Sequence, residues 1–428
     1  MTPPRQLPRP RRRPRRRPRP RAPRGLADLW SVVPYRYFLS AQFVTGFSVW
    51  MQRLVQDWLV LELTGSSAAV GVTVALQFLP MLLVGPAFGL VADRHDKRRL
   101  VQIATAVAAL LGFALAALVL SGSAQPWHLY VFAVLLGLVT AMDQPTRQAL
   151  VGEIVGDSRL RTAVSTNNVV AQLSGMIAPA VAGVLIHSVG EGWSFVVTAS
   201  LALVGLALLS LVRTAASDVS HRLRPAPGQI REGFRYVVQH PTLRWVFVLA
   251  GCIGAFGMNG PVVLTAFAET EWGSGATGFG LYNSASAVGA MTGAVIGARV
   301  RSLDMRLVVW AAAIFGAVEI VAALMPTELA FVVALIAVGA ATLLFITSAA
   351  SLVQLTAPAA MRGRVLAIYS PVLLGGHAVG GLVAGALTES IGVREGLVVV
   401  GVLAMVSALV TAIAVRGRRE DGGAPPPH

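Results

Sequence analysis

Long apolar segments recur along almost the whole of this chain, from residue 37 to residue 415. A bilayer hydrocarbon core is roughly 30 Å thick, and a helix needs about 20 apolar residues to cross it. Of the 428 residues, 55% are hydrophobic and 13% are charged, a balance that soluble domains of this length do not normally show. A membrane β-barrel would instead show shorter segments of alternating polarity. The sequence therefore predicts an all-α membrane protein.

We expect twelve membrane-spanning helices in two six-helix bundles related by pseudo-symmetry. Residues 159–211 can be aligned with residues 362–415, which supports an internal repeat. The expected organisation is a disordered Pro/Arg-rich tail over 1–35, a bundle over 36–213, a linker with an amphipathic helix over 214–240, a second bundle over 241–416 and a disordered tail over 417–428. The expected spans are 37–63, 68–92, 99–120, 127–147, 164–187, 194–212, 243–267, 278–300, 307–324, 329–352, 365–387 and 397–415.

Positive charge is distributed asymmetrically about these spans. Of the 35 lysines and arginines, only Arg394 falls on the opposite side and Arg53 within a span, which leaves 33 on one side. Because positively charged loops stay in the cytoplasm, both termini are expected there. The predominance of arginine over lysine is typical of a GC-rich bacterium, so the plasma membrane of a bacterium is the expected location.

Eleven of the arginines lie in the first 24 residues, interleaved with prolines. Such a tract cannot bury a core, and we expect it to lie beside anionic membrane lipid. Nucleic acid is not an expected partner, because no aromatic residue is interleaved for base stacking. A misassigned start of the chain is the alternative reading of this tail.

Common sequence motifs of enzyme active sites are missing from the sequence. Cys252 is the single cysteine, so a disulfide within the chain is impossible and a cysteine-ligated metal is not expected. The chain has no phosphate-binding glycine loop, no zinc-spaced histidine pair and no nucleophile elbow. We therefore expect no enzymatic activity, no cofactor and no metal.

Arg53 and Asp57 are the most informative residues, because they place two charges within the first span. Residues four apart lie on one face of a helix, and charge at membrane depth usually faces a cavity. The polar side chains of Gln52 and Gln56 are expected to belong to the same site. A carboxylate balanced by an arginine could take up or release a proton as substrate arrives, but a permanent salt bridge within the helix is the alternative.

Further polar residues within the spans are candidates for the lining of a substrate cavity. Asn168 and Gln172 lie in the fifth predicted span and His377 in the eleventh. Each could instead make a hydrogen bond between helices. Glu319, in the ninth span, is expected to have a structural role or to face lipid.

The loop after the second span carries Gly89, Asp93, Arg94 and Arg98. It resembles the signature Gly-x3-Asp-Arg-x-Gly-Arg-Arg of the major facilitator superfamily, with Asp96 in place of the second glycine. The resemblance implies a gating loop whose charges latch one conformation. Asp143 and Arg147, at the end of the fourth span, belong to the same expected gate, with Asp143 expected to pair with Arg94 or Arg98.

The fifth span contains Ala178, Pro179 and Gly183 at the spacing of the antiporter signature Gly-x3-Gly-Pro-x2-Gly-Gly of exporters in this superfamily. Alanine and serine replace some of its glycines. Small residues allow two helices to approach closely, and proline frees a backbone carbonyl. We therefore expect a bending contact between the two bundles here.

Three stretches, residues 52–65, 92–99 and 143–153, resemble the enterobactin-exporter-like branch of the superfamily. The resemblance implies proton-driven efflux of an amphiphilic small molecule, such as a siderophore or a drug, by alternating access. Small-molecule substrate, protons and membrane lipids are then the expected partners, and we expect a monomer. Movement of lysolipid between leaflets, nutrient import, and a sensor or scaffold without transport are the alternatives.

Overall fold

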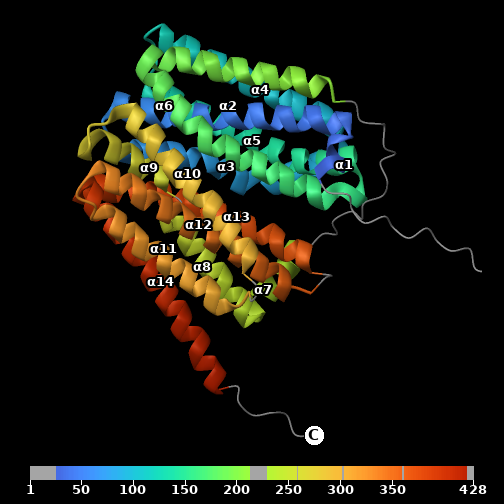
Figure 1. Cartoon of the computed structure of the whole chain (residues 1–428), viewed down its shortest axis with the longest axis vertical. Coiled ribbons are helices and arrows are strands. Elements are labelled where there is room, and N and C mark those ends of the chain that lie inside the picture. Colours follow the sequence, from blue (N-terminus) through green and yellow to red (C-terminus); the bar gives the residue numbers. More distant parts are fainter. Residues whose placement is uncertain (1–25, 213–228, 258, 301–302, 359–360, 422–428) are drawn as a thin grey trace, which may run out of the picture.

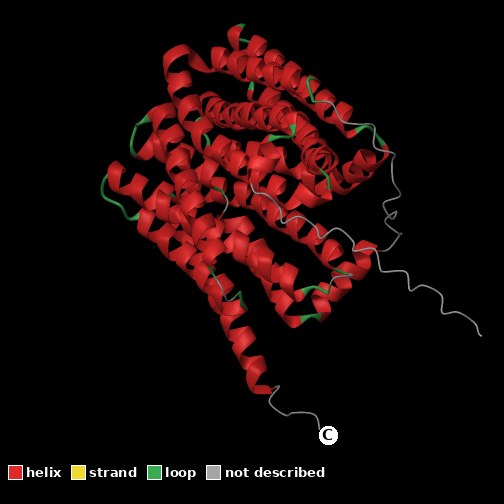
Figure 2. Ribbon diagram, turned by 45° about the vertical axis from the view of Figure 1, so that its right-hand side comes forward, coloured by secondary structure: helices red, strands yellow, loops and turns green. Residues whose placement is uncertain are grey.

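The computed structural model describes residues 26–212, 229–257, 259–300, 303–358 and 361–421. Every regular element in these ranges is a helix, and Figure 2 shows the helices joined by short loops. Residues 1–25 and 422–428 of the two expected tails, and residues 213–228 at the start of the linker, lie outside the described residues. Residues 26–30, 33–35 and 417–421 of the expected tails are helical. The prediction of an all-α membrane protein is confirmed.

The first half comprises six helices. They are α1 (Leu26–Trp30), α2 (Val33–Thr64), α3 (Ser67–Arg94), α4 (Lys97–Leu120), α5 (Pro126–Val155) and α6 (Asp157–Ser210). Within α6 the chain turns at Gly190, whose backbone φ of 80° lies in the left-handed region that favours glycine. This turn divides α6 into two arms that correspond to two predicted spans.

The second half begins with the short α7 (Gln229–Gln239). It continues with α8 (Pro241–Gly257), α9 (Gly260–Ala266), η1 (Phe267–Glu271), α10 (Gly275–Arg299), α11 (Met305–Ala323), α12 (Glu328–Thr356), α13 (Arg362–Ile391) and α14 (Val393–Asp421). The seventh span was expected to be one continuous helix over 243–267. It is instead interrupted after Gly257, because Pro261 lacks the amide hydrogen that a continuous helix would use.

Nine helices of the described chain are long and apolar enough to cross a bilayer. That number counts α6 once, although Gly190 divides it, and it leaves out α2 and α10. Polar residues such as Arg53 and Asp57 lower the mean hydropathy of α2. Adding α2, α10 and the second arm of α6 gives the twelve spans that we predict, and the count of twelve stays a prediction.

Several helices begin at a residue whose side chain accepts a hydrogen bond from the first turn. Ser66 accepts from the amide of Ala69 at 3.2 Å, and Asp96 accepts from the amide of Arg99 at 3.1 Å. Such caps satisfy backbone donors that a helix start leaves unpaired. They explain why the helices begin where the apolar segments meet the polar loops.

The ends of the helices define two sides of the molecule with opposite charge. We call one the basic side and the other the acidic side. The basic side carries Arg36, Lys97, Arg159, Arg306 and Arg364, and the acidic side carries Glu62, Glu271, Glu328, Glu389 and Arg394.

At the basic side, α7 is tied to α13 by an ion pair of 2.6 Å between Glu232 and Arg364. The helix α7 occupies the part of the linker where an amphipathic helix is expected, and the domain boundaries stay predictions.

The two halves meet through α3 against α13 and through α6 against α10. At the first contact Gly71 faces Gly381, and a Cβ added at Gly381 would lie 3.1 Å from the carbonyl oxygen of Gly71. Small residues allow backbones to approach this closely. Both contacts lie in the acidic halves of these helices, and Figure 1 shows the ribbons of the two halves spreading apart toward α1 and α7.

Candidate transport site

Asp57 lies two turns before the C-terminal end of α2 and is 3% exposed. Its Oδ1 atom accepts a hydrogen bond from Nε2 of Gln77, on α3, at 3.1 Å. Among the described residues, Asp57 and Arg53 do not form an ion pair within 4.0 Å. The alternative of a permanent salt bridge between them therefore does not describe this conformation.

The guanidinium group of Arg53 lies over aromatic rings. Its central carbon is 4.9 Å from the centre of the Phe78 ring and 5.8 Å from that of the Trp50 ring. A cation held over an aromatic face is stabilised by the ring quadrupole, and the stabilisation grows where water is excluded. Arg53 is thus held by aromatic rings, one helical turn before Asp57 on α2.

His377, on α13, reaches this group from the other half of the molecule. Its ring centre is 4.3 Å from that of Phe78, with the two rings nearly perpendicular at 74°. The side chain is 5% exposed, and within the described part of the chain neither ring nitrogen has a hydrogen-bond partner. Phe78 therefore contacts both Arg53 in its own half and His377 in the other half.

Gln77 and Phe78 are residues of this group that the sequence analysis did not single out. A lone glutamine in the apolar segment of α3 was a signal, because a buried amide needs partners. Phe78 carried no signal, since phenylalanine is an ordinary core residue. Only the packing of α2, α3 and α13 assigns it to the group.

Gln52 and Gln56, which we expected in the same site, face the interior of the first half. Nε2 of Gln56 donates to the carbonyl oxygen of Leu129, on α5, at 2.8 Å. Nε2 of Gln52 points toward Gly112, on α4, where an added Cβ would lie 3.7 Å away. One residue along a helix changes the direction of a side chain by about 100°. The two amides are therefore turned toward α4 and α5 and not toward α13.

Asn168 and Gln172 lie one turn apart on the first arm of α6, and both are exposed. Positions four apart share a face of a helix, so the two amides point to the same side. Their role as residues lining a substrate cavity stays a prediction.

The described part of the expected gate contains an ion pair within α5. Asp143 pairs with Arg147 at 2.5 Å, and Nη2 of Arg98 donates to the carbonyl oxygen of Ser210 at 2.6 Å. Among the described residues Asp143 therefore pairs with Arg147 and not with Arg98, and its pairing with Arg94, the other predicted partner, stays a prediction. Arg147 is four residues away on the same helix and reaches the carboxylate from the next turn. Gly89 and the side chains of Asp93 and Arg94 lie outside the part that the structure describes.

Arg147 also connects α5 to two other helices. Its guanidinium donates to Oε1 of Gln42, on α2, at 3.2 Å and to Oγ1 of Thr105, on α4, at 3.0 Å. A buried arginine with three acceptors satisfies the geometry that its planar group favours. The residue therefore holds three helices together near the basic side.

The stretch with Ala178, Pro179 and Gly183 lies where the two halves meet. A Cβ added at Gly183 would lie 2.5 Å from the carbonyl oxygen of Ala276, on α10, and 3.2 Å from the Cα atom of Gly280. Ala178 is fully buried. These small residues let α6 and α10 touch along their backbones, and the antiporter role of the stretch stays a prediction.

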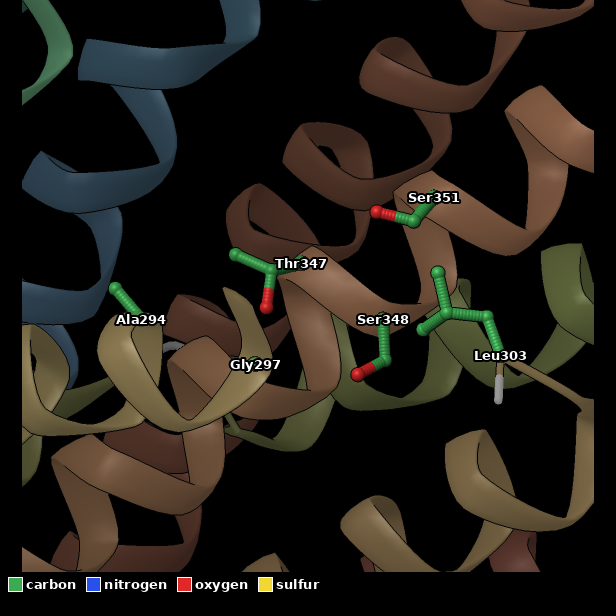
Figure 3. A pocket seen from close by; sticks show the side chains of 6 residues that line it. All are labelled: Ala294, Gly297, Leu303, Thr347, Ser348 and Ser351. Atoms are coloured by element: carbon green, nitrogen blue, oxygen red, sulfur yellow. The ribbon is translucent and has the colours of Figure 1, made fainter. Parts of the chain in front are cut away.

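A small cavity with three hydroxyl-bearing side chains in its wall lies at the basic end of the contact between α10 and α12. It has a volume of about 170 Å³ and is lined by Ala294, Gly297, Leu303, Thr347, Ser348 and Ser351 (Figure 3). Oγ of Ser348 is buried and has no hydrogen-bond partner among the described residues. The cavity has room for a few water molecules, which would satisfy that hydroxyl group.

Long apolar helices in two halves, with charges buried between them, define a membrane transporter and not an enzyme. Residues 26–422 match the model of the transmembrane secretion effector family. The chain belongs to this family of the major facilitator superfamily. The expected superfamily, its efflux branch and the absence of an enzymatic function are thereby confirmed.

Proteins similar to this chain include exporters. The chain is 24% identical to an enterobactin exporter of Citrobacter koseri, over 87% of this chain and 91% of that protein. It is also 24% identical to the multidrug efflux pump Tap of Mycolicibacterium fortuitum, over 91% and 97%. A crystal structure of a bacterial homolog of the human lysosomal transporter Spinster matches with a TM-score of 0.73 and 14% identity, over 92% of this chain and 99% of that one. The last likeness shows the shared fold.

Proposed function

We propose that this protein is a proton-coupled exporter of amphiphilic small molecules, such as a drug or a siderophore. Two of its relatives are named as an enterobactin exporter and a multidrug efflux pump, which supports export. It would act as a monomer in the plasma membrane of a bacterium. Both termini would lie in the cytoplasm, because the basic side carries nearly all lysines and arginines.

The arrangement of Asp57, Arg53 and His377 around Phe78 is the observation that carries this proposal. A carboxylate at membrane depth is costly and is usually retained for function. Asp57 has a single hydrogen bond, from Gln77, and no ion pair among the described residues, so its charge state can change without dismantling a network. Protonation of Asp57 leaves Arg53 over its aromatic rings, and loss of the proton attracts Arg53 toward the carboxylate.

A displacement of Arg53 would shift the ring of Phe78 and thereby change its contact with the other half of the molecule. Phe78 is in contact with Arg53 and with the ring of His377, so its position depends on both. Coupling between a proton and a substrate requires that each favours a different conformation of the transporter. In the proposed cycle, the proton on Asp57 and the substrate between the halves both act on the contact between Phe78 and His377. One of them favours the conformation in which this contact is made, and the other favours the conformation in which it is broken.

The test is efflux of ethidium from cells that express the protein, with and without a protonophore. We expect efflux that the protonophore abolishes and that Asp57→Asn reduces to the level of cells without the protein. Glu269→Gln, which neutralises an exposed carboxylate at the acidic side, is the matched control and should leave efflux unchanged. Efflux by Asp57→Asn at the normal rate would remove Asp57 from the mechanism.

A second assay separates direction of transport from coupling. Vesicles with an imposed proton gradient would report uptake of labelled substrate, which a proton symporter and a proton antiporter perform with opposite directions of the gradient. Efflux that persists with the protonophore would contradict proton coupling. The membership of the chain in its transporter family does not depend on this result.

A further inference from the structure

A large apolar groove lies on the outer face of the second half, between α11 and α14. Its volume is about 1100 Å³, at or above the upper end of the roughly 300–1,000 Å³ that small-molecule pockets occupy. Its walls include Trp310, Leu409 and Ile413, which are 65%, 60% and 63% exposed. In a membrane protein such a surface is covered by lipid tails, and a groove of this depth can hold them in a defined position.

The groove has a clear structural cause. α11 and α14 cross at Gly316 and Gly401, where a Cβ added at Gly401 would lie 2.7 Å from the carbonyl oxygen of Gly316. From this crossing the two helices run toward the basic side with larger side chains between them. The groove therefore opens in the half of the membrane next to the basic side, where α14 projects past the other helices (Figure 1).

Arg306 lies at the basic end of the groove and is one of its lining residues. It is exposed, and it has no ion pair with any described carboxylate. The nearby Asp304 caps α11 by accepting from the amide of Leu307 at 3.0 Å. A cation in the first turn of a helix opposes the helix dipole, so Arg306 does not serve the stability of α11.

Trp310 follows Arg306 by four residues and shares its face of α11. Tryptophan is enriched at the depth where lipid headgroups meet the acyl chains. Along α11, the positive charge of Arg306 is thus followed by the interfacial Trp310 and then by the apolar walls of the groove.

We propose that this groove binds an anionic phospholipid of the membrane. The phosphate lies at Arg306, and the acyl chains run past Trp310 toward the Gly316–Gly401 crossing. Basic pockets between transmembrane helices bind anionic headgroups in this way. A zwitterionic lipid would bring a positive amine beside Arg306, so the charge of the groove selects against it. The inference goes beyond the proposed function and does not depend on the transported substrate.

The test is native mass spectrometry of the full chain in detergent, with phosphatidylglycerol or phosphatidylcholine of the same acyl chains added. We expect bound phosphatidylglycerol to exceed bound phosphatidylcholine. Arg306→Gln should weaken retention of phosphatidylglycerol about fivefold, the effect of one arginine near an anionic lipid. Arg36→Gln, which removes an exposed arginine at the basic side of α2, is the matched control and should leave retention unchanged.

A second measurement places the lipid in the groove. Phosphatidylglycerol brominated in its acyl chains should quench fluorescence of the normal protein more than that of Trp310→Phe, because bromine quenches only a nearby indole. Equal retention of the two lipids, equal losses in Arg306→Gln and Arg36→Gln, or equal quenching in the presence and absence of Trp310 would each overturn the proposal.

Discussion

Glu389, near the end of α13, caps the start of α3 by accepting a hydrogen bond from Oγ of Ser66 at 2.6 Å. The same oxygen accepts from the backbone amide of Ala68 at 3.1 Å. A carboxylate is favoured at the N-terminus of a helix, where backbone donors and the helix dipole attract negative charge. Here the carboxylate and the helix belong to different halves of the molecule. The interaction therefore holds the two halves together at the acidic side.

Glu389→Gln is expected to favour separation of the halves at the acidic side, because the amide carries no charge for the helix dipole. A capping interaction of about 0.7 kcal/mol corresponds to a shift of roughly threefold in the equilibrium between the two conformations. Electron–electron distance measurements between spin labels at Ser123→Cys and Leu329→Cys, with Cys252→Ser, would report it. Glu395→Gln is the control, and an unchanged distance distribution in Glu389→Gln would show that the interaction does not hold the halves.

Gly183→Ala is expected to weaken the contact between α6 and α10. Its added methyl group would meet the carbonyl oxygen of Ala276 at 2.5 Å, so the two helices must move apart. Efflux should fall, and the same pair of spin labels should move to longer distances. Gly85→Ala is the matched control, because a Cβ there would lie 3.9 Å from the nearest atom, in Met81. Equal efflux in the two variants would mean that the close approach has no role in transport.

Asp143→Asn is expected to lower the thermal stability of the protein in detergent. It weakens a pair in which the Arg147 side chain is only 8% exposed, and removal of one partner from a buried ion pair costs on the order of 3 kcal/mol. The bonds from Arg147 to Gln42 and Thr105 would reduce this loss. Arg99→Gln breaks the exposed Asp96–Arg99 pair and should cost under about 1 kcal/mol. Melting temperatures that fall equally in both variants would contradict this ranking.

Phe78→Leu and His377→Leu are expected to have non-additive effects on efflux. The two rings are in contact across the halves, and contacting residues commonly show interaction energies of about 0.5–3 kcal/mol in double-mutant cycles. Efflux rates of the normal protein, both single variants and the double variant give this energy. Combining Phe78→Leu with Phe247→Leu, which removes a ring that packs on Tyr369, provides the control. Additive effects in the first cycle would remove Phe78 as the link between Arg53 and His377.

The helical segments could be predicted closely because their length is a local property of the chain. The segment over 127–147 was recognised from its apolar residues, although α5 extends to Val155 beyond the apolar part. The break near Gly257 was not predicted, since Pro261 alone is compatible with a kinked helix as well as an interrupted one. Hydropathy determines which residues enter the membrane, whereas backbone hydrogen bonding determines where each helix ends.

The candidate site was predictable in part. The spacing of Arg53 and Asp57 places them on one face of α2, and that relationship needs no tertiary structure. Their separation, the hydrogen bond from Gln77 and the ring contact between Phe78 and His377 depend on how α2, α3 and α13 pack. The pairing of Asp143 with Arg147 in place of Arg98 depends on the same kind of choice between nearby partners.

The amino-acid sequence alone predicts that this chain crosses a membrane many times, that its positive charges gather on one side and that a few charged residues, such as Arg53 and Asp57, lie within the spans. These properties follow from the cost of exposing polar groups to lipid, which acts on each segment independently. Which residues face each other across the two halves, such as Glu389 with Ser66 and His377 with Phe78, follows from the packing of the folded chain. Contacts between distant segments depend on packing of whole helices, which no single segment encodes.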